Sequence, residues 1–153
     1  MSPEEAGARL AALVAGDAVI GEEEQVFALL TVDSDGSPRS CALSRTEIAV
    51  DGLAVHVAVH ARRTTTNIER DERATLVAYD GDVIMAIRLA LASGFSDAGL
   101  FAARLDIVGA EADSLGIPLR PPTFVATPEV SILEHWDRTR AALGILAARH
   151  TGG

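Results

Sequence analysis

Apolar and polar residues alternate in several short segments of the chain, which is the pattern of β-strands with one buried face. Three such runs, rich in β-branched and apolar residues, follow one another at 26–32, 39–50 and 53–60. Turn-forming residues at 33–38 separate the first two runs, and Asp51-Gly52 forms a tight hairpin turn between the others. The pattern predicts three antiparallel strands joined in order as a meander.

In the third run the valines alternate with alanine and histidine. Val55, Val57 and Val59 therefore share the face expected to form the core. His56 and His60 lie on the opposite face, which we expect to be either wet or part of a site. The two histidines are roughly 13 Å apart along a strand, too far to bind one metal ion, and polar lining is the simpler interpretation.

The rest of the chain alternates predicted helices and strands. Ser2 starts a helix that Gly16 can stop, and Thr127-Pro128 opens a closing helix with Leu133, Trp136 and Leu143 near one face. Further strands are expected at 74–79, 83–92 and 100–110, although 83–92 would also suit a helix. A short helix is expected at 64–71, with Thr64 or Thr65 as its N-cap.

Together these elements predict a single domain, 1–153, of mainly β (α+β) class: a small antiparallel barrel of about six strands with helices packed outside it. The net charge is −9, so the basic surface that nucleic-acid binding needs is missing. No lysine is present, which excludes Schiff-base chemistry. With one cysteine, Cys41, no membrane-length apolar run and no signal-like start, we expect a cytoplasmic protein with neither a membrane span nor a cysteine-based metal site.

The stretch RRTTTN, residues 62–67, places two arginines and three threonines at the start of the short helix. A helix start carries unpaired N–H groups and the positive end of the helix dipole, so it attracts an anion. Guanidinium and hydroxyl groups there add donors suited to a phosphate. The simpler interpretation is that a threonine caps the helix while the arginines lie in solvent.

The order of these elements, with the segments PRSCALS and RRTTTNIERDERATL, resembles the flavin-binding split-barrel family, the pyridoxamine 5′-phosphate oxidase-like proteins. The resemblance is best over residues 25–92. It implies a six-stranded Greek-key split β-barrel that forms a homodimer with FMN in a groove at the interface. It also implies that the protein is a flavin-dependent oxidoreductase, whose small-molecule substrate is unidentified.

The resemblance assigns cofactor-binding residues by position. Arg39 would be the strand arginine that holds the phosphate, together with Arg63, Thr64 and Thr65. The flavin ring would be lined by the segment after Arg39 and by the end of the third strand: Ser40, Cys41, Ala42, Leu43, Ser44, Val59 and His60. Arg62 would either add a phosphate contact or obstruct the flavin, and Asn67 would fix the loop.

Some features differ from the family pattern. The Arg-x-His segment of true pyridoxamine phosphate oxidases is absent near the C-terminus, so vitamin B6 oxidation is not expected. Alternatives are a deazaflavin-dependent reductase and a non-catalytic flavin- or haem-binding barrel, in which His135 could be an axial ligand. No catalytic side chain is assigned, since His60 is only a candidate acid or base and Cys41 is interpreted as a small apolar residue.

Overall fold

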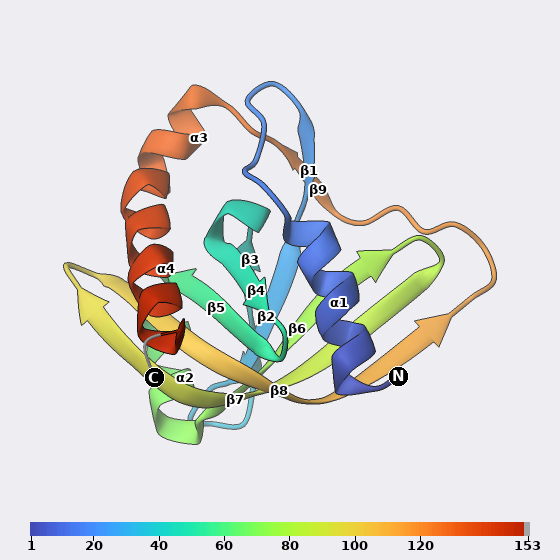
Figure 1. The fold of residues 1–153 in the computed structure, drawn as a ribbon, viewed down its shortest axis with the longest axis horizontal. Helices are drawn as coiled ribbons and strands as arrows, with labels where there is room; N and C mark the ends of the chain where they lie inside the picture. The colour runs from blue at the N-terminus through green and yellow to red at the C-terminus, as the bar shows by residue number, and fades with distance from the viewer. Residues whose placement is uncertain (152–153) are drawn as a thin grey trace.

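The computed structural model describes residues 1–151 and consists mainly of antiparallel β-structure (Figure 1). The helices are α1 (Pro3–Val14), the 3₁₀ turn η1 (Arg45–Glu47), α2 (Arg62–Asp71), α3 (Pro128–Leu133) and α4 (Trp136–Thr151). The strands are β1 (Glu23–Gln25), β2 (Phe27–Val32), β3 (Pro38–Leu43), β4 (Ile48–Asp51), β5 (Ala54–Val59), β6 (Arg73–Asp80), β7 (Val83–Asp97), β8 (Leu100–Ser114) and β9 (Thr123–Val125). Among residues 1–151, no helix combines the length and the hydrophobicity needed to traverse a bilayer.

The main sheet has seven strands in the order β3-β2-β6-β7-β8-β5-β4, and β1 pairs with β9 in a small second sheet. The segment 39–50, predicted as one strand, forms two strands separated by η1. Ser44 and Glu47 make reciprocal capping bonds across this turn, which stops the strand. The predicted meander is therefore wrong, because β3 and β4 lie at opposite edges of the sheet and leave the free edge of β3 open.

The β7–β8 hairpin contains the two longest strands of the sheet, and it curves across the lower part of the view in Figure 1. The ambiguous segment 83–92 is a strand, and β7 continues to Asp97 rather than ending at residue 92. Ser93–Asp97 pair with Leu100–Arg104 across the hairpin, after register shifts at Arg88/Leu89 and Leu91/Ser93. Cross-strand pairing thus maintains extended backbone through a stretch whose own composition indicated a break.

The core lies between the sheet and α1. Val55, Val57 and Val59 point into it as predicted, and Leu10 and Ala6 of α1 are fully buried against the same cluster. Fully burying a Val or Leu side chain stabilises a fold by about 1.5–3 kcal/mol. The valine face of β5 and the inner face of α1 therefore belong to one apolar core.

The other face of β5 is covered by α4. Ala58 and Ala102 of the sheet pack against Leu143 and Leu146, and His56 is buried beneath the helix. This face is therefore dry along most of its length, rather than open to solvent, because an apolar stripe on a distant helix matches it.

The closing helix begins as predicted, with Thr127 capping α3. It is two helices, however, because the chain turns at Glu134–His135, where His135 has a positive φ of 51°. Leu133, predicted on the buried face, is 74% exposed, whereas Trp136 and Leu143 beyond the turn are buried. The turn thus redirects the chain so that α3 leaves its apolar side in solvent.

Candidate functional site

The predicted cofactor residues lie where β3, the end of β5 and the start of α2 meet. The helix α2 begins at Arg62, with Ala61 as its N-cap and no side chain capping it. The prediction that Thr64 or Thr65 is the N-cap is wrong, because the helix starts two residues earlier and both threonines lie inside it. The first N–H groups of α2 consequently have no capping side chain, which is the local geometry that an anion satisfies.

The three threonines of α2 differ in their hydrogen bonds. Thr65 and Thr66 donate to backbone carbonyls one turn earlier, Thr65 Oγ1 to Ala61 O at 3.2 Å and Thr66 Oγ1 to Arg62 O at 3.0 Å. The Thr64 hydroxyl is buried, has no hydrogen-bond partner and lies beside the Cys41 thiol of β3. Among these threonines, Thr64 is the one whose hydroxyl faces the Cys41 thiol, and this contact partly offsets the rise in the pKa of that thiol.

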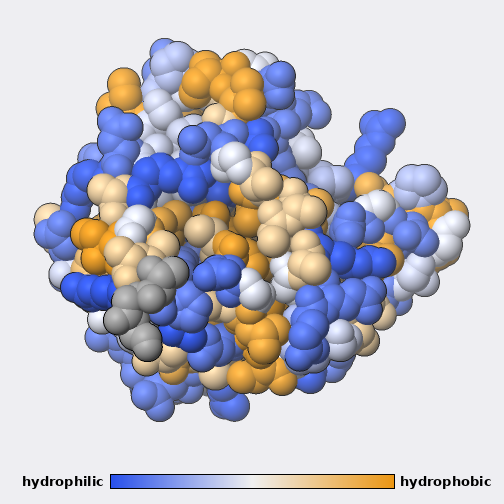
Figure 2. Space-filling view, viewed as in Figure 1, coloured by the Kyte–Doolittle hydropathy of each residue, from blue (hydrophilic) through white to orange (hydrophobic). Residues whose placement is uncertain are grey.

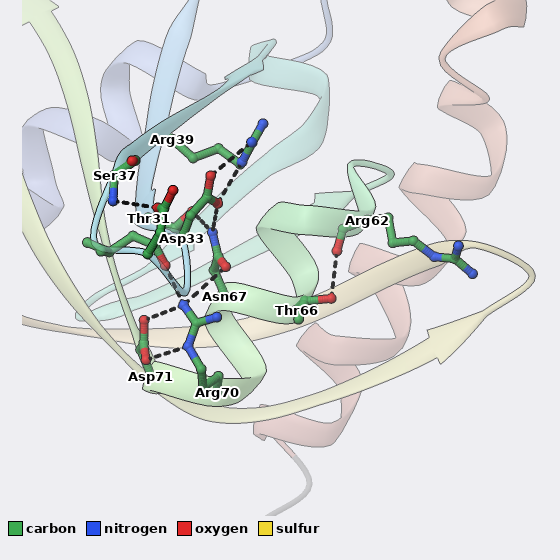
Figure 3. A network of polar contacts seen from close by, with 11 residues as sticks. Thr31, Asp33, Ser37, Arg39, Arg62, Thr66, Asn67, Arg70 and Asp71 are labelled. Carbon is green, nitrogen blue, oxygen red and sulfur yellow. Dashed lines mark hydrogen bonds and ion pairs between the residues drawn. The ribbon is translucent and has the colours of Figure 1, made fainter.

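A polar network fixes the loop between β2 and β3 beside α2 (Figure 3). Arg39 binds Asp33 with two bonds, Nε to Oδ1 at 2.8 Å and Nη2 to Oδ2 at 2.9 Å. Asn67 Nδ2 donates to Asp33 Oδ1 at 2.8 Å and to Thr31 Oγ1 at 3.0 Å, while Arg70 donates to Asn67 Oδ1 at 3.1 Å. The bonds from Arg39 and Asn67 lower the pKa of Asp33 to about 2. Arg39 is therefore engaged with a carboxylate, and Asn67 fixes the loop as expected.

Arg62 and Arg63 are exposed, and within residues 1–151 neither forms an ion pair. Both line an open hollow of about 410 Å³ that also includes Asp33, Asp35 and Arg70. Figure 3 shows the Arg62 side chain extending away from the Asp33–Asn67 network. The hollow is therefore mixed in charge, with its free cations at the start of α2.

The ring-lining residues predicted from the resemblance are partly exposed and partly buried. Ser40 and Ala42 are exposed on β3, whose free edge leaves backbone groups unpaired. Val59 is fully buried in the core. Burial raises the pKa of the Cys41 thiol and the nearby Glu47 carboxylate raises it further, so Cys41 is not prepared as a nucleophile.

His60 directly follows β5 and lies close to the α3–α4 turn. Its ring centroid lies 5.6 Å from that of His135, and its buried Nε2 atom has no hydrogen-bond partner. Burial lowers the pKa of His60, and the neighbouring His135 lowers it further. The pKa of His60 therefore lies below its ordinary value, and one of its ring nitrogens has no hydrogen-bond partner within residues 1–151.

A second hollow, of about 160 Å³, adjoins Ala42, Leu43 and Ser44. Its carboxylate Glu47, which sequence reasoning missed, accepts from Ser44 N at 3.0 Å and from Ser44 Oγ at 2.9 Å. Burial raises the pKa of Glu47 to about 7, and the charge of Glu134 also raises it. The Ser-x-x-Glu spacing of a capping box is visible in the sequence and could have indicated this residue.

No family model matches the chain, and no curated protein matches it in sequence. Solved structures do resemble it. The flavin reductase of styrene monooxygenase from Pseudomonas putida S12 is 9% identical, with a TM-score of 0.51 over 69% of this chain and 88% of that one. Nitrilotriacetate monooxygenase component B from Mycobacterium thermoresistibile is 14% identical, with a TM-score of 0.52 over 69% and 77%.

A third structure, from Clostridium acetobutylicum, is described as related to general stress protein 26 of the pyridoxinephosphate oxidase family. It is 14% identical to this chain, with a TM-score of 0.53 over 80% of this chain and 95% of that one. At these identities the similarity establishes the fold. The chain has the split-barrel fold of flavin reductases and pyridoxamine-phosphate-oxidase-like proteins, as the sequence predicted.

Proposed function

We propose that the protein binds FMN and acts as a flavin-dependent oxidoreductase on a small molecule. The observation that carries this proposal is the start of α2, a helix with no capping side chain and with two exposed arginines that form no ion pair within residues 1–151. A phosphate group would accept hydrogen bonds from the free N–H groups and from these guanidinium groups. The redox-active ring of FMN would supply the hydride or electron chemistry, and the protein would supply binding and orientation.

In this proposal Arg62, Arg63 and the first N–H groups of α2 hold the phosphate. Arg39 contributes indirectly, because its two bonds to Asp33 neutralise a carboxylate that would otherwise repel the phosphate. The free edge of β3 would place backbone donors and acceptors along the ring. Ser40 and Ala42 lie on that edge, and the unpartnered Nε2 of His60 lies at the end of β5.

We also propose a homodimer with the cofactor at the interface. Ile132 and Leu133 of α3 are 72% and 74% exposed, and Figure 2 shows hydrophobic atoms gathered at the top of the view, where α3 lies. Burying exposed apolar side chains of this size favours association. A second copy docked there would lie near the α3–α4 turn and the hollow beside β3.

A non-catalytic split-barrel protein is the alternative, and one observation favours it. The hollow at α2 carries Asp33 and Asp35 beside its arginines, and Arg39 is committed to Asp33. If these carboxylates repel a phosphate, the barrel would bind no flavin. Flavin uptake therefore separates the two functions.

The test is a titration of the purified protein with FMN, followed by flavin fluorescence. We expect Arg63→Ala to weaken binding by about 10–100-fold, because one charge-assisted hydrogen bond contributes about 1.5–3 kcal/mol. Arg73→Ala is the matched control, since Arg73 is an exposed arginine just beyond α2 that does not line the hollow. Failure of the unmodified protein to bind FMN, or equal losses in both variants, would reject the phosphate assignment.

A further inference from the structure

The hollow beside Ser44, which we call the carboxylate hollow, has apolar walls and acidic polar groups. Phe124, Val130 and Trp136 form part of its wall, and Glu47 and Glu134 are its ionisable residues. Within residues 1–151, no basic side chain lines it. At about 160 Å³ it is small compared with typical ligand pockets, so it can take one compact group rather than a whole flavin.

Glu47 is 6% exposed, and its hydrogen bonds come only from Ser44 in the described part of the chain. A carboxylate in apolar surroundings is unfavourable when ionised without a cation. Glu134 adds a second negative charge to the same hollow and raises the pKa of Glu47. A bound cation would remove both penalties, because it would lie between two carboxylates that repel each other.

The neighbouring cations are already engaged or lie beyond Glu134. Arg45 binds Glu24 with Nε to Oε1 at 2.5 Å, and Arg140 pairs with Asp17. His60 and His135 lie close to Glu134, and burial lowers the pKa of His60. Burial and the negative charge of Glu47 raise the pKa of the Cys41 thiol. Within residues 1–151, no permanently charged cation therefore pairs with Glu47.

Trp136 provides an independent sign of a missing ligand. Its side chain lines the hollow and is buried, yet its Nε1 donor has no hydrogen-bond partner. An unpaired buried donor is destabilising, and an oxygen atom on a ligand would satisfy it. The indole face also attracts cations.

We propose that the carboxylate hollow binds a small organic ammonium ion with an apolar body and a hydrogen-bond acceptor. Because the hollow adjoins the ring-lining segment Ala42–Ser44, this ion would be the charged end of the substrate, an assignment that rests on the proposed flavin-dependent function. The ammonium group binds Glu47 and Glu134, the apolar body contacts Phe124, and the acceptor meets the indole N–H of Trp136.

Trp136 is the single tryptophan of the chain, so its fluorescence reports directly on occupancy of the hollow. The probes are 3-methoxybenzylamine and its neutral analogue 3-methoxybenzyl alcohol, titrated into the flavin-free protein. We expect saturable binding of the amine and at least tenfold weaker binding of the alcohol. Between pH 6 and pH 8 the amine stays protonated while Glu47 ionises, so its affinity should rise about tenfold.

Glu47→Gln should abolish this pH dependence, and Glu134→Gln should weaken amine binding several-fold without altering the fold, since Glu134 is exposed. Glu129→Gln, an exposed glutamate of α3 outside the hollow, is the matched control and should bind as the unmodified protein does. Equal binding of amine and alcohol, or equal effects of the three variants, would overturn the cation site. Amine binding without FMN uptake would instead overturn the flavin function and leave the site standing.

Discussion

At the scale of single residues, the partner of each polar group decides its chemical role. Arg39 lies in β3 and forms an ion pair with Asp33. Arg63 lies in the first turn of α2 and forms no ion pair within residues 1–151. Thr64 and Thr65 are adjacent, yet only the Thr64 hydroxyl is buried without a partner. The phosphate assignment therefore concentrates on Arg62, Arg63 and the first N–H groups of α2.

Glu47 gives a prediction for stability against pH. Its pKa rises from 4.5 to about 7 on folding, so the folded state binds the extra proton between these values. The stabilisation is present below about pH 4.5 and is lost as the pH rises through 7. Relative to Glu47→Gln, which keeps an oxygen to accept from Ser44, the unmodified protein should lose roughly 2–3 kcal/mol of unfolding free energy from pH 5 to pH 8.

Urea unfolding of both proteins at pH 5, 6.5 and 8 measures this difference. Other titrating groups, including His56, are common to both proteins and cancel in the comparison. Parallel stability profiles would mean that Glu47 is solvated and ionises at its ordinary pKa.

At the scale of elements, the errors of sequence reasoning concern the ends of helices and strands: local bonds between Ser44 and Glu47 end β3, and pairing with β8 extends β7. The break inside 39–50 was hidden because Ser44–Glu47 is flanked on both sides by strand-like residues. The extension of β7 through Ser93–Asp97 depends on pairing with β8. Strand identity and the start of α3 followed from local pattern and capping, which is why those predictions are confirmed.

The packing of α1 against the β4–β5 hairpin depends on Gly7. A Cβ atom at this position would lie 2.4 Å from the backbone oxygen of Gly52, so Gly7→Ala must displace the helix. We expect a loss of about 1–3 kcal/mol of unfolding free energy, as for other overpacked sites. Gly144→Ala in α4 meets no atom within 4 Å and should instead stabilise the protein by about 0.5–1 kcal/mol.

Thermal and urea unfolding of the two alanine variants checks this pair. Opposite signs are expected, because both glycines lie within helices and differ only in the space around them. A neutral Gly7→Ala variant would show that α1 packs less closely on Gly52.

At the scale of the whole molecule, the exposed apolar side chains of α3 are the basis of the proposed homodimer. We expect the protein to be a dimer in solution, and Ile132→Asp with Leu133→Asp to shift it to monomer. The matched control is Leu115→Asp with Ile117→Asp, which changes two side chains that are similarly exposed, at 60% and 59%, in the loop after β8.

Sedimentation or light scattering gives the mass of each variant. A specific interface buries about 800 Å² on each partner, so two charges within it should prevent association. A monomeric unmodified protein would remove the proposed interfacial cofactor site. Loss of the dimer in the control pair alone would move the interface to the β8–β9 loop.

The sequence pattern by itself indicated most strands of the main sheet, a small antiparallel barrel and the cationic start of α2, because these depend on local alternation, turn residues and neighbours along the chain. The split-barrel fold class followed from the resemblance to that family. The sequence could not determine that Arg39 binds Asp33, that α4 covers the outer face of β5, or that Glu47 and Trp136 share a hollow. Glu47 and Trp136 are far apart in the chain and meet only when η1 and α4 pack together. The burial that gives Glu47 its pKa therefore exists only in the tertiary structure.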